Sequence, residues 1–306
     1  MIKKKLLAWL KLSRVPFLIP GLAPFLAGVV YGLSKGFNLD IMLFTIAISG
    51  LTLILLATYY SNEYFDYEGD LINRGFNRFS GGSRVLPSSL LPRRYALYAL
   101  SSSLFTFIAL SLTLYLLDYF KSFPLLFLFA VVGIFVGLSY STPPIKLAYR
   151  GIGETVIGFC YGWLTFNSGY YIVSGRIELA TTILSLPIAF SIFSVILINE
   201  FPDLEADKAV GKKNLVVRLG LRRASKLYIF AILASYLSAL MCVAFGGPKS
   251  LLLTSLPILI LVIALVYKMI KEEYRAPKEL EKICALTIVL NALYSLSIIA
   301  SSMMQS

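Results

Sequence analysis

The stretch ILLATYYSNEYFDYEGD (residues 54–70) runs from an apolar segment directly into a row of acids. A second stretch, SVILINEFPDLEAD (residues 194–207), does the same. Both contain the pattern N-E-x-x-D-x-E-x-D, so the chain carries one motif twice. Ionisable residues at or within membrane helices are expensive to place there, and for that reason they mark candidate functional sites. The rest of the sequence decides whether these segments cross a membrane.

The composition is that of a membrane protein. Of the 306 residues, 58% are hydrophobic and 14% are charged, and the mean hydropathy is +0.80. A soluble globular domain carries about 25% charged residues. Apolar runs recur along the chain and leave no polar block large enough for a soluble domain. We therefore expect residues 1–306 to form a single membrane-embedded domain of two half-repeats, with the motifs at 62–70 and 199–207.

The apolar runs predict an all-α integral membrane fold. A helix needs about 20 mostly apolar residues to cross the hydrocarbon core of a bilayer. About nine segments meet this requirement. They are residues 15–34, 41–61, 95–117, 123–141, 152–173, 179–199, 225–246, 250–268 and 283–302. We expect these helices to surround a central cavity onto which both motifs face.

The basic residues give the bundle a direction. Most of the 28 Lys and Arg residues fall on one side if the N-terminus is cytoplasmic, and the loops of the other side keep only Lys35, Lys121, Arg176 and Lys249. Positive charge concentrates on the cytoplasmic side of membrane proteins. The pattern predicts a multi-pass protein of the cell membrane with a cytoplasmic N-terminus and a cytoplasmic active site. The net charge of +12 then needs no nucleic acid to explain it.

The motif residues are suited to bind a metal ion. Residues four apart lie on one face of a helix, so each motif presents a column of oxygen ligands. The candidate metal ligands are Asn62, Asp66, Asp70, Asn199, Asp203 and Asp207. The chain has no histidine, and its three cysteines lie far apart in apolar runs, so oxygen ligands remain. Oxygen ligands favour a hard cation such as Mg²⁺.

An alternative interpretation is that each motif is a solvated, acidic end of a helix. The same five residues in both copies, including the opening asparagine, favour a shared site instead. One difference between the copies is expected. Pro202 has no counterpart in the first motif and should break or kink the helix just before Asp203.

Basic residues cluster next to the acids and are candidates for diphosphate binding. The segment FSGGSRV (79–85) contains two glycines that can present backbone amides to an anion. The segment YSTPPIKLAYRGIGE (140–154) reaches the same side of the membrane. The candidate substrate contacts in and around these segments and the motifs are Arg78, Arg84, Lys146, Lys208, Asn62, Asn199 and, as a hydrogen-bond donor, Tyr140. Alternatively, many of the cations serve only as anchors at the membrane surface.

These features resemble the UbiA superfamily of intramembrane prenyltransferases. The resemblance rests on the paired motifs, the Arg-Val-Pro sequence at residues 14–16 and the segment 140–154. It implies an all-helical fold, two Mg²⁺ ions on the two motifs, and transfer of an isoprenoid chain from its diphosphate to a lipophilic, often aromatic acceptor. It also implies that Arg14 contacts substrate. Glu63 and Glu200 depart from the pattern of many relatives, so no role is transferred to them.

Within the superfamily, NEYFDY, SGGSRVL and LAYRGIGE are most similar to the branch that prenylates 1,4-dihydroxy-2-naphthoate toward menaquinone. The predicted function is therefore Mg²⁺-dependent prenyl transfer in quinone biosynthesis, with release of diphosphate. Geranylgeranylglyceryl phosphate, as in ether-lipid synthesis, is the alternative acceptor. The chain length of the polyprenyl diphosphate and the oligomeric state are not predicted.

The expected mechanism starts with metal held by Asp66 and Asp203, which neutralises the diphosphate as the allylic C–O bond breaks, with Tyr140 beside it. Aromatic faces can stabilise the allyl cation. The candidate rings are Tyr59, Tyr60, Phe65, Tyr140 and Tyr161. Residues 71–93, which we name the lid segment, are polar and rich enough in glycine to close over the site. No residue stands out as the base that removes a proton from the acceptor.

Two other classes of function compete with this prediction. A secondary transporter also has internal repeats and paired acids, but its ion sites lie near the middle of the membrane. The acids here follow the inner ends of the second and sixth predicted spans. A lipid phosphotransferase would also use metal-bound acids, but the Asp-Gly and Ala-Arg signature expected for it is missing.

Overall fold

The structure, a computed structural model, describes residues 2–305, and these contain helices and no strand. The α-helices are α1 (Ile2–Leu12), α2 (Ile19–Ser34), α3 (Ile41–Phe65), α4 (Tyr67–Ile72), α5 (Arg94–Leu116), α6 (Tyr119–Ser122), α7 (Pro124–Ser139), α8 (Gly153–Ile157), α9 (Thr165–Ser174), α10 (Leu179–Asn199), α11 (Leu204–Ala209), α12 (Leu215–Leu219), α13 (Leu221–Ala244), α14 (Leu251–Thr254), α15 (Leu256–Ile270) and α16 (Pro277–Met303). A π-helix, η3 (Gly158–Leu164), joins α8 to α9. Three short 3₁₀ helices complete the set: η1 (Val15–Leu18), η2 (Leu147–Tyr149) and η4 (Glu273–Arg275).

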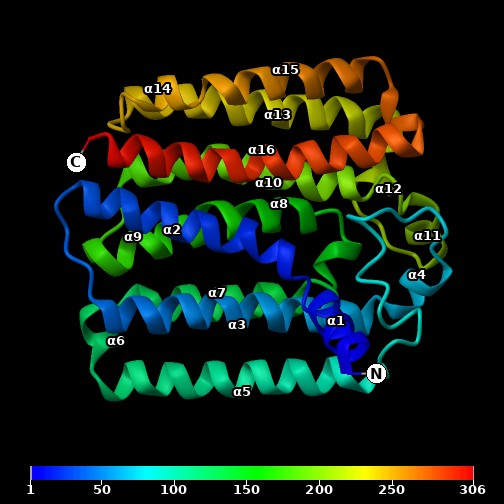
Figure 1. Ribbon diagram of the computed structural model, residues 1–306, viewed down its shortest axis with the longest axis horizontal. Helices are drawn as coiled ribbons and strands as arrows, with labels where there is room; N and C mark the ends of the chain where they lie inside the picture. The colour runs from blue at the N-terminus through cyan, green and yellow to red at the C-terminus, as the bar shows by residue number, and fades with distance from the viewer. Residues whose placement is uncertain (1, 306) are drawn as a thin grey trace.

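The long helices lie side by side in layers (Figure 1). The order runs from α13 and α15, through α10 and α16, to α2 and α9, and then to α3 and α7, with α5 packed against α3 at the edge. The first and last described residues lie at opposite ends of this bundle (Figure 1). The short helices α4 and α11, which carry the ends of the two motifs, and α12 are gathered at the same end as α1 (Figure 1).

The all-helical membrane fold predicted from the apolar runs is confirmed. Seven helices are long and apolar enough to cross a membrane, and α7 is a shorter apolar helix. The fifth predicted span, 152–173, corresponds to a helical run that is divided into α8, η3 and α9. The count of nine spans and the cytoplasmic N-terminus stay predictions. The first predicted span began at residue 15, but the structure adds the separate helix α1 before it.

Helix α3 carries the first motif at its end. Asp40 caps its start, because the carboxylate accepts hydrogen bonds from the amides of Met42 (2.9 Å) and Leu43 (3.0 Å). The helix ends at Phe65, and α4 begins after Asp66. The helical hydrogen bonds continue across this junction, with the Asp66 amide bonded to the Asn62 carbonyl at 2.8 Å. The first motif therefore keeps its column of ligands.

Helix α10 carries the second motif and ends more abruptly. It stops at Asn199, and α11 starts at Leu204. Pro202 lies between them and lacks the N–H that a continuing helix needs. The predicted break before Asp203 is confirmed.

Polar contacts join the helices on the α10 side of the bundle. The hydroxyls of Tyr228 on α13 and Thr287 on α16 form a hydrogen bond of 2.6 Å. Further along the same two helices, the hydroxyls of Ser235 and Tyr294 form another of 2.9 Å. The amide of Asn291 donates to Ser191 on α10 at 2.9 Å. Such bonds hold helices together where lipid offers no hydrophobic driving force between them. Helices α13 and α16 therefore support α10, the helix that carries the second motif.

Candidate active site

All six predicted metal ligands line one cavity. The cavity has a volume of about 180 Å³ and lies at the end of the bundle where α4 and α11 come together. Its walls include Asn62, Asp66 and Asp70 from the first motif and the three equivalent residues from the second. The two helix ends, which are far apart in sequence, therefore face a common space.

Asp66 is held from the segment that follows α7. Its Oδ2 accepts a hydrogen bond from the Ser141 hydroxyl at 2.7 Å, and its Oδ1 accepts one from the Tyr149 hydroxyl at 3.3 Å. Tyr149 also lines the cavity. Two hydroxyl donors fix the orientation of the carboxylate while leaving lone pairs for a cation. Nothing in the sequence distinguishes Tyr149 from the other tyrosines of the chain.

Asp203 is held from the lid segment. Its Oδ1 accepts a hydrogen bond from Nδ2 of Asn73 at 2.7 Å, and its Oδ2 accepts one from the amide of Gly81 at 3.0 Å. Gly81 has a φ of 66°, a conformation that glycine adopts without steric cost. The lid segment thus crosses from the first motif to the second and forms part of the cavity wall.

Glu63, the second residue of the first motif, ties two other parts of the chain together. Its Oε1 accepts hydrogen bonds from Nε (2.8 Å) and Nη2 (2.5 Å) of Arg14 and from the amide of Ser83 (2.7 Å). Its Oε2 accepts one from the Ser83 hydroxyl at 2.6 Å. Glu63 is therefore fully engaged within the protein. Arg14 lines the cavity, as a substrate contact requires, but its charge is already balanced by Glu63.

The equivalent end of the second motif has its own cation. Asp207 accepts a hydrogen bond from Nδ2 of Asn214 at 2.7 Å and lies 3.4 Å from Nζ of Lys212. Burial raises the pKa of Asp207 to about 6, although Lys212 opposes that rise. Burial, together with the charges of Glu63 and two motif aspartates, raises the pKa of Asp70 to about 8 despite Arg14. Acids with raised pKa values in a cleft mark a candidate functional site.

The donor atoms fit a hard divalent cation. The Oδ1 atoms of Asn62 and Asn199 are buried and have no hydrogen-bond partner among the described residues. Both asparagines line the cavity that the four aspartates also line. Within residues 2–305, no three acids, cysteines or histidines are close enough to form a ready-made metal cluster. Oxygen donors of this kind suit Mg²⁺, which keeps several waters and takes one or two carboxylates together with phosphate oxygens.

Four predicted substrate contacts lie outside the lining of this cavity. Arg78 forms an exposed ion pair with Glu281, and Lys208 pairs with Glu205 on the surface. The other two are engaged elsewhere: Arg84 donates to the Asp70 carbonyl and stacks on Phe76, and Lys146 lies over the Tyr149 ring. The geometry gives these four assignments no support, and they stay predictions. Lys212 lines the cavity instead.

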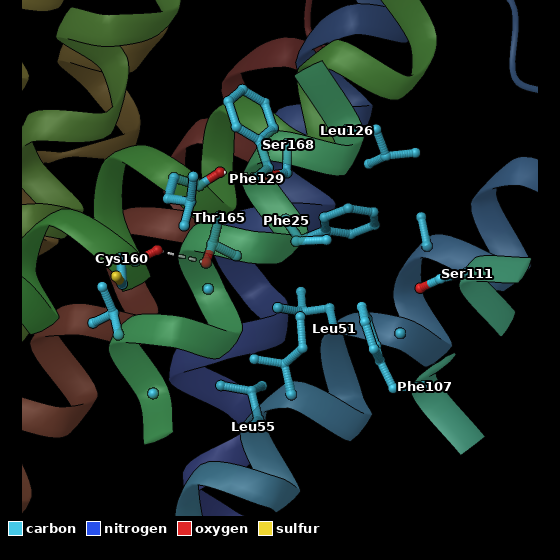
Figure 2. Close-up of a pocket in the computed structure, with 18 of the residues that line it drawn as sticks. Phe25, Leu51, Leu55, Phe107, Ser111, Leu126, Phe129, Cys160, Thr165 and Ser168 are labelled. Carbon is cyan, nitrogen blue, oxygen red and sulfur yellow. Dashed lines mark hydrogen bonds between the residues drawn. The ribbon is translucent and has the colours of Figure 1, made fainter. Parts of the chain in front are cut away.

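A second, apolar cavity adjoins the first. It has a volume of about 110 Å³ and is enclosed by α2, α3, α5, α7 and the η3–α9 region. Figure 2 shows Phe25, Leu51, Leu55 and Leu126 around it. The Thr165 hydroxyl in its wall is bonded to the Cys160 carbonyl at 2.7 Å, so it presents little polarity to the interior. The cavity is suited to a hydrocarbon chain.

The two cavities share Thr58, Ile157 and Tyr161, which places their junction on α3, α8 and η3. The hydroxyl of Tyr161 lies 3.3 Å from that of Tyr59, which donates to the Phe17 carbonyl at 2.7 Å. The π-helix that carries Tyr161 is a rare element, often found at functional sites.

The five predicted aromatic residues are divided by the structure. Tyr140, Tyr59 and Tyr161 line the polar cavity. Tyr60 is buried in another cluster and bonds Ser13 at 2.7 Å, and Phe65 packs edge-on against Tyr64. Neither Tyr60 nor Phe65 is among the residues that line the cavity. The structure therefore brings three of the five predicted rings to the cavity of the motif residues.

Residues 21–289 match the UbiA prenyltransferase family. The 1,4-dihydroxy-2-naphthoate octaprenyltransferase of Bacillus subtilis (strain 168) is 26% identical over 231 residues, which are 74% of this chain and 70% of the relative.

Two solved structures share the fold. A UbiA homolog from Archaeoglobus fulgidus bound to GPP and Mg²⁺ has a TM-score of 0.62 and 16% identity, with 96% of this chain and 99% of that chain covered. A structure described in work on digeranylgeranylglyceryl phosphate synthase in membranes has a TM-score of 0.62 and 21% identity over 98% and 99% of the two chains. With its apolar helices, this chain is an integral membrane protein. It belongs to the UbiA prenyltransferase family.

Proposed function

We propose that this protein transfers an isoprenoid chain from an allylic polyprenyl diphosphate to a lipophilic aromatic acceptor, with Mg²⁺ as cofactor. The observation that carries the proposal is the junction of two cavities. One is lined by the oxygens of both motifs and the other by apolar side chains, and they meet at Tyr161. A polyprenyl diphosphate has the same two parts, a charged head and an apolar tail.

The motif residues hold the head of the substrate. Asp66, Asp70, Asp203 and Asp207, with Asn62 and Asn199, supply the ligands for two Mg²⁺ ions, as the Mg²⁺-bound relative of known structure supports. When bound, the metal neutralises charge on the departing diphosphate. The protein contributes the fixed positions of these oxygens, which the donors to Asp66 and Asp203 maintain. Preorganised groups of this kind cost no reorganisation when the bond breaks.

Lys212 is the cation we place on the diphosphate. It lines the cavity and approaches Asp207 at 3.4 Å, longer than a tight ion pair, so its ammonium can reach a bound anion as well. The rings of Tyr59, Tyr140 and Tyr161 stabilise positive charge on the allyl group by cation–π contact. The apolar cavity receives the tail, and the lid segment limits the access of water to the head.

The leading acceptor is 1,4-dihydroxy-2-naphthoate. The Bacillus subtilis relative and the sequence motifs support it. Geranylgeranylglyceryl phosphate is the second candidate, since the fold is shared with a structure from work on digeranylgeranylglyceryl phosphate synthase. The basic residues on the side of the motifs support a cytoplasmic active site within a single domain.

The assay that tests the proposal uses the purified full-length protein with Mg²⁺ and radiolabelled geranylgeranyl or farnesyl diphosphate. The acceptor panel contains dihydroxynaphthoate, hydroxybenzoate and geranylgeranylglyceryl phosphate. We expect a prenylated lipid to form only when Mg²⁺ and one of these acceptors are present. Inertness toward the whole panel would contradict the proposal, and substrate flux into vesicles without chemical change would support the transporter alternative.

A further inference from the structure

The first helix, α1, has a buried face and an exposed apolar face. Ala8 and Leu12 are buried in a cluster that joins α1 to α3 and α5. Leu6, Leu7 and Leu10 are 58%, 50% and 48% exposed. Leu10 lies three residues after Leu7 and four after Leu6, so the three side chains form one surface of the helix. A contiguous apolar surface of this kind marks a site of interaction.

Cations flank this leucine surface. Lys3, Lys4, Lys5 and Lys11 are all exposed. Within the described residues, none of their ammonium groups forms an ion pair or a side-chain hydrogen bond. Lys4 precedes Leu7 by three residues and Lys11 follows it by four, so both are neighbours of the leucines on the helix surface. A partner that covers the leucines therefore meets positive charge at the same time.

The backbone separates α1 from the membrane span that follows it. Arg14, between α1 and η1, has a φ of 44° and a ψ of 44°, a left-handed conformation that ends a right-handed helix. Helix α1 runs obliquely to the long helices, at the end of the bundle where α4 and α11 lie (Figure 1). The break allows α1 to lie along the membrane surface while α2 crosses the membrane.

Aromatic rings support a position at the membrane surface. Trp9 stacks on Tyr95 of α5, with 6.0 Å between the ring centroids, and the centroid of Tyr95 lies 6.1 Å from that of Tyr98. Tyr98 is 62% exposed, and Arg94, the residue before Tyr95, is also exposed. Trp and Tyr are enriched where lipid headgroups meet the hydrocarbon core. The three rings therefore indicate the level of the headgroups at α1.

We propose that α1 is an in-plane membrane helix that binds anionic phospholipid. Its leucines enter the boundary of the acyl chains, and its lysines contact the headgroup phosphates. Helices that combine Leu and Trp with Lys bind membrane surfaces in this way, and each basic residue near an anionic surface strengthens the attraction. The inference concerns a surface outside the cavities and does not rest on the proposed function.

A second copy of the chain is a poorer partner for the same surface. A symmetric pair uses the same surface patch on both copies. Such a pair would bring the lysines of one α1 against those of the other, and like charges in contact oppose association. The charge of the surface therefore favours an anionic lipid over a second α1.

The experiment compares three sets of substitutions in full-length protein that carries Trp163→Phe. The chain has two tryptophans, so Trp9 is then the only one and reports on α1 by its fluorescence. The first set replaces all four lysines of α1 by glutamine, and the second is Leu7→Gln with Leu10→Gln. The control set removes the same charge at the other end of the helices: Lys35→Gln, Lys121→Gln, Arg176→Gln and Lys249→Gln.

Short-chain phosphatidylglycerol and phosphatidylcholine are titrated separately into each protein in a neutral detergent. The unsubstituted α1 should bind phosphatidylglycerol at a concentration roughly 10- to 100-fold lower than phosphatidylcholine, and the control set should keep this preference. The four lysine substitutions should remove most of it. The leucine substitutions should weaken the binding of both lipids by roughly tenfold and keep their ratio, because they reduce apolar burial and leave the charge unchanged.

A second measurement locates α1 in nanodiscs that contain phosphatidylglycerol. Bromine on the acyl chains, placed near the headgroup or near the middle of the bilayer, quenches tryptophan at its own depth. Trp9 should be quenched more strongly by the bromine near the headgroup. Stronger quenching from the middle of the bilayer would show a spanning α1 and overturn the inference, and so would the absence of quenching from both.

Two further outcomes also overturn the inference. One is equal affinity for the two lipids in the protein with unsubstituted α1, or an equal loss of preference in the lysine and control sets. The other is a dimer, measured by light scattering, that dissociates in the leucine variant, because a second copy would then cover α1. Size-exclusion chromatography confirms folding of every variant. None of these measurements needs turnover, so a failure of the proposed function would leave their results unchanged.

Discussion

The two copies of the motif carry the same acids but balance their charges differently. In the second copy, the last acid, Asp207, has the cation Lys212 at 3.4 Å and the Asn214 amide at 2.7 Å. In the first copy, the last acid is Asp70, and Arg14, the cation that acts on its carboxyl, is held by Glu63. The repeat has kept its ligands and changed their partners.

The consequence is a difference in proton binding between the copies. Burial raises the pKa of both acids, to about 8 for Asp70 and about 6 for Asp207. A cation opposes the rise in each copy, Arg14 in the first and Lys212 in the second, but the charge of Glu63 adds to the rise at Asp70. In the metal-free protein, Asp70 in the first motif therefore keeps its proton to a higher pH than Asp207 in the second. The second motif can therefore bind a cation directly, whereas the first must release a proton before it binds one.

Removal of one acid from either copy of the motif should have the largest effect on activity. Asp66→Ala and Asp203→Ala should each lower kcat by roughly 100- to 1,000-fold, because each removes part of the charge that stabilises the departing diphosphate. Turnover is measured with saturating substrates, and size-exclusion chromatography confirms folding. Glu68→Gln and Glu205→Gln, exposed acids of the same two motifs, serve as matched controls. Full activity in either alanine variant would show that one motif suffices.

The cation of the second copy gives the next largest effect. Lys212→Ala should raise the KM of the prenyl diphosphate by roughly 10- to 100-fold, since it removes a charged contact to the anion. Lys208→Ala should have little effect, because Lys208 pairs with Glu205 on the surface. The sequence alone indicates Lys208 as the diphosphate contact, whereas the structure assigns this contact to Lys212. An equal rise in KM in the two variants would contradict the structural assignment.

The proton of the first copy predicts how Mg²⁺ binding depends on pH. A protonated carboxyl cannot ligate the cation, so the half-saturating Mg²⁺ concentration should fall about tenfold per pH unit as pH rises toward 8 and then level off. Binding of an unreactive prenyl diphosphate analogue provides the measurement without an acceptor. A flat profile between about pH 6 and 8 would mean that Asp70 releases no proton on metal binding.

The same proton on Asp70 also affects the stability of the fold. A rise in pH should strengthen Mg²⁺ binding but lower the stability of the metal-free protein. The folded-state pKa of Asp70 lies above its ordinary value of 3.8, so the folded protein binds this proton more tightly than the unfolded chain does. Stability from this group is present at low pH and is lost as pH rises through about 8. The melting temperature of the metal-free protein should therefore fall over this range, and Mg²⁺ should reduce the loss. Asp70→Asn should make this fall smaller, because it removes the contribution of this one carboxyl.

The smallest expected effect concerns the apolar cavity. Gly133 lines it, and an added side chain there would point toward Ile54. Gly133→Leu should shorten the preferred prenyl chain and lower kcat/KM for geranylgeranyl relative to geranyl diphosphate by roughly tenfold. Ala234→Leu, in a lipid-facing groove between α13 and α15, is the control for added bulk. An unchanged preference would place the tail elsewhere.

The sequence predicted the parts of this protein that depend on local pattern. The apolar runs gave the helices, and Pro202 gave the break before Asp203. The spacing of Asn62, Asp66 and Asp70 placed them on one face, and all three line the cavity with their counterparts. These features follow from helical periodicity and from the missing amide of proline, which need no knowledge of tertiary contacts.

The remaining features depend on which segments meet in three dimensions. Lys208 and Lys212 lie four residues apart, and only the fold decides that Lys212 turns into the cavity. Tyr149 was missed because its partner, Asp66, lies in another part of the chain. The different fates of Glu63 and Glu200 depend on Arg14 and Ser83, which reach one of them and not the other.

The central claim is that both motifs grip one metal-bound diphosphate. Its most direct test is a crystal structure of the protein with Mn²⁺ and an unreactive prenyl thiodiphosphate, in which anomalous scattering locates the metal. We expect anomalous density next to Asp66 and next to Asp203, with the diphosphate between the two columns and the tail passing Tyr161 into the apolar cavity. Metal on only one motif, or a diphosphate bound away from the other, would contradict the account.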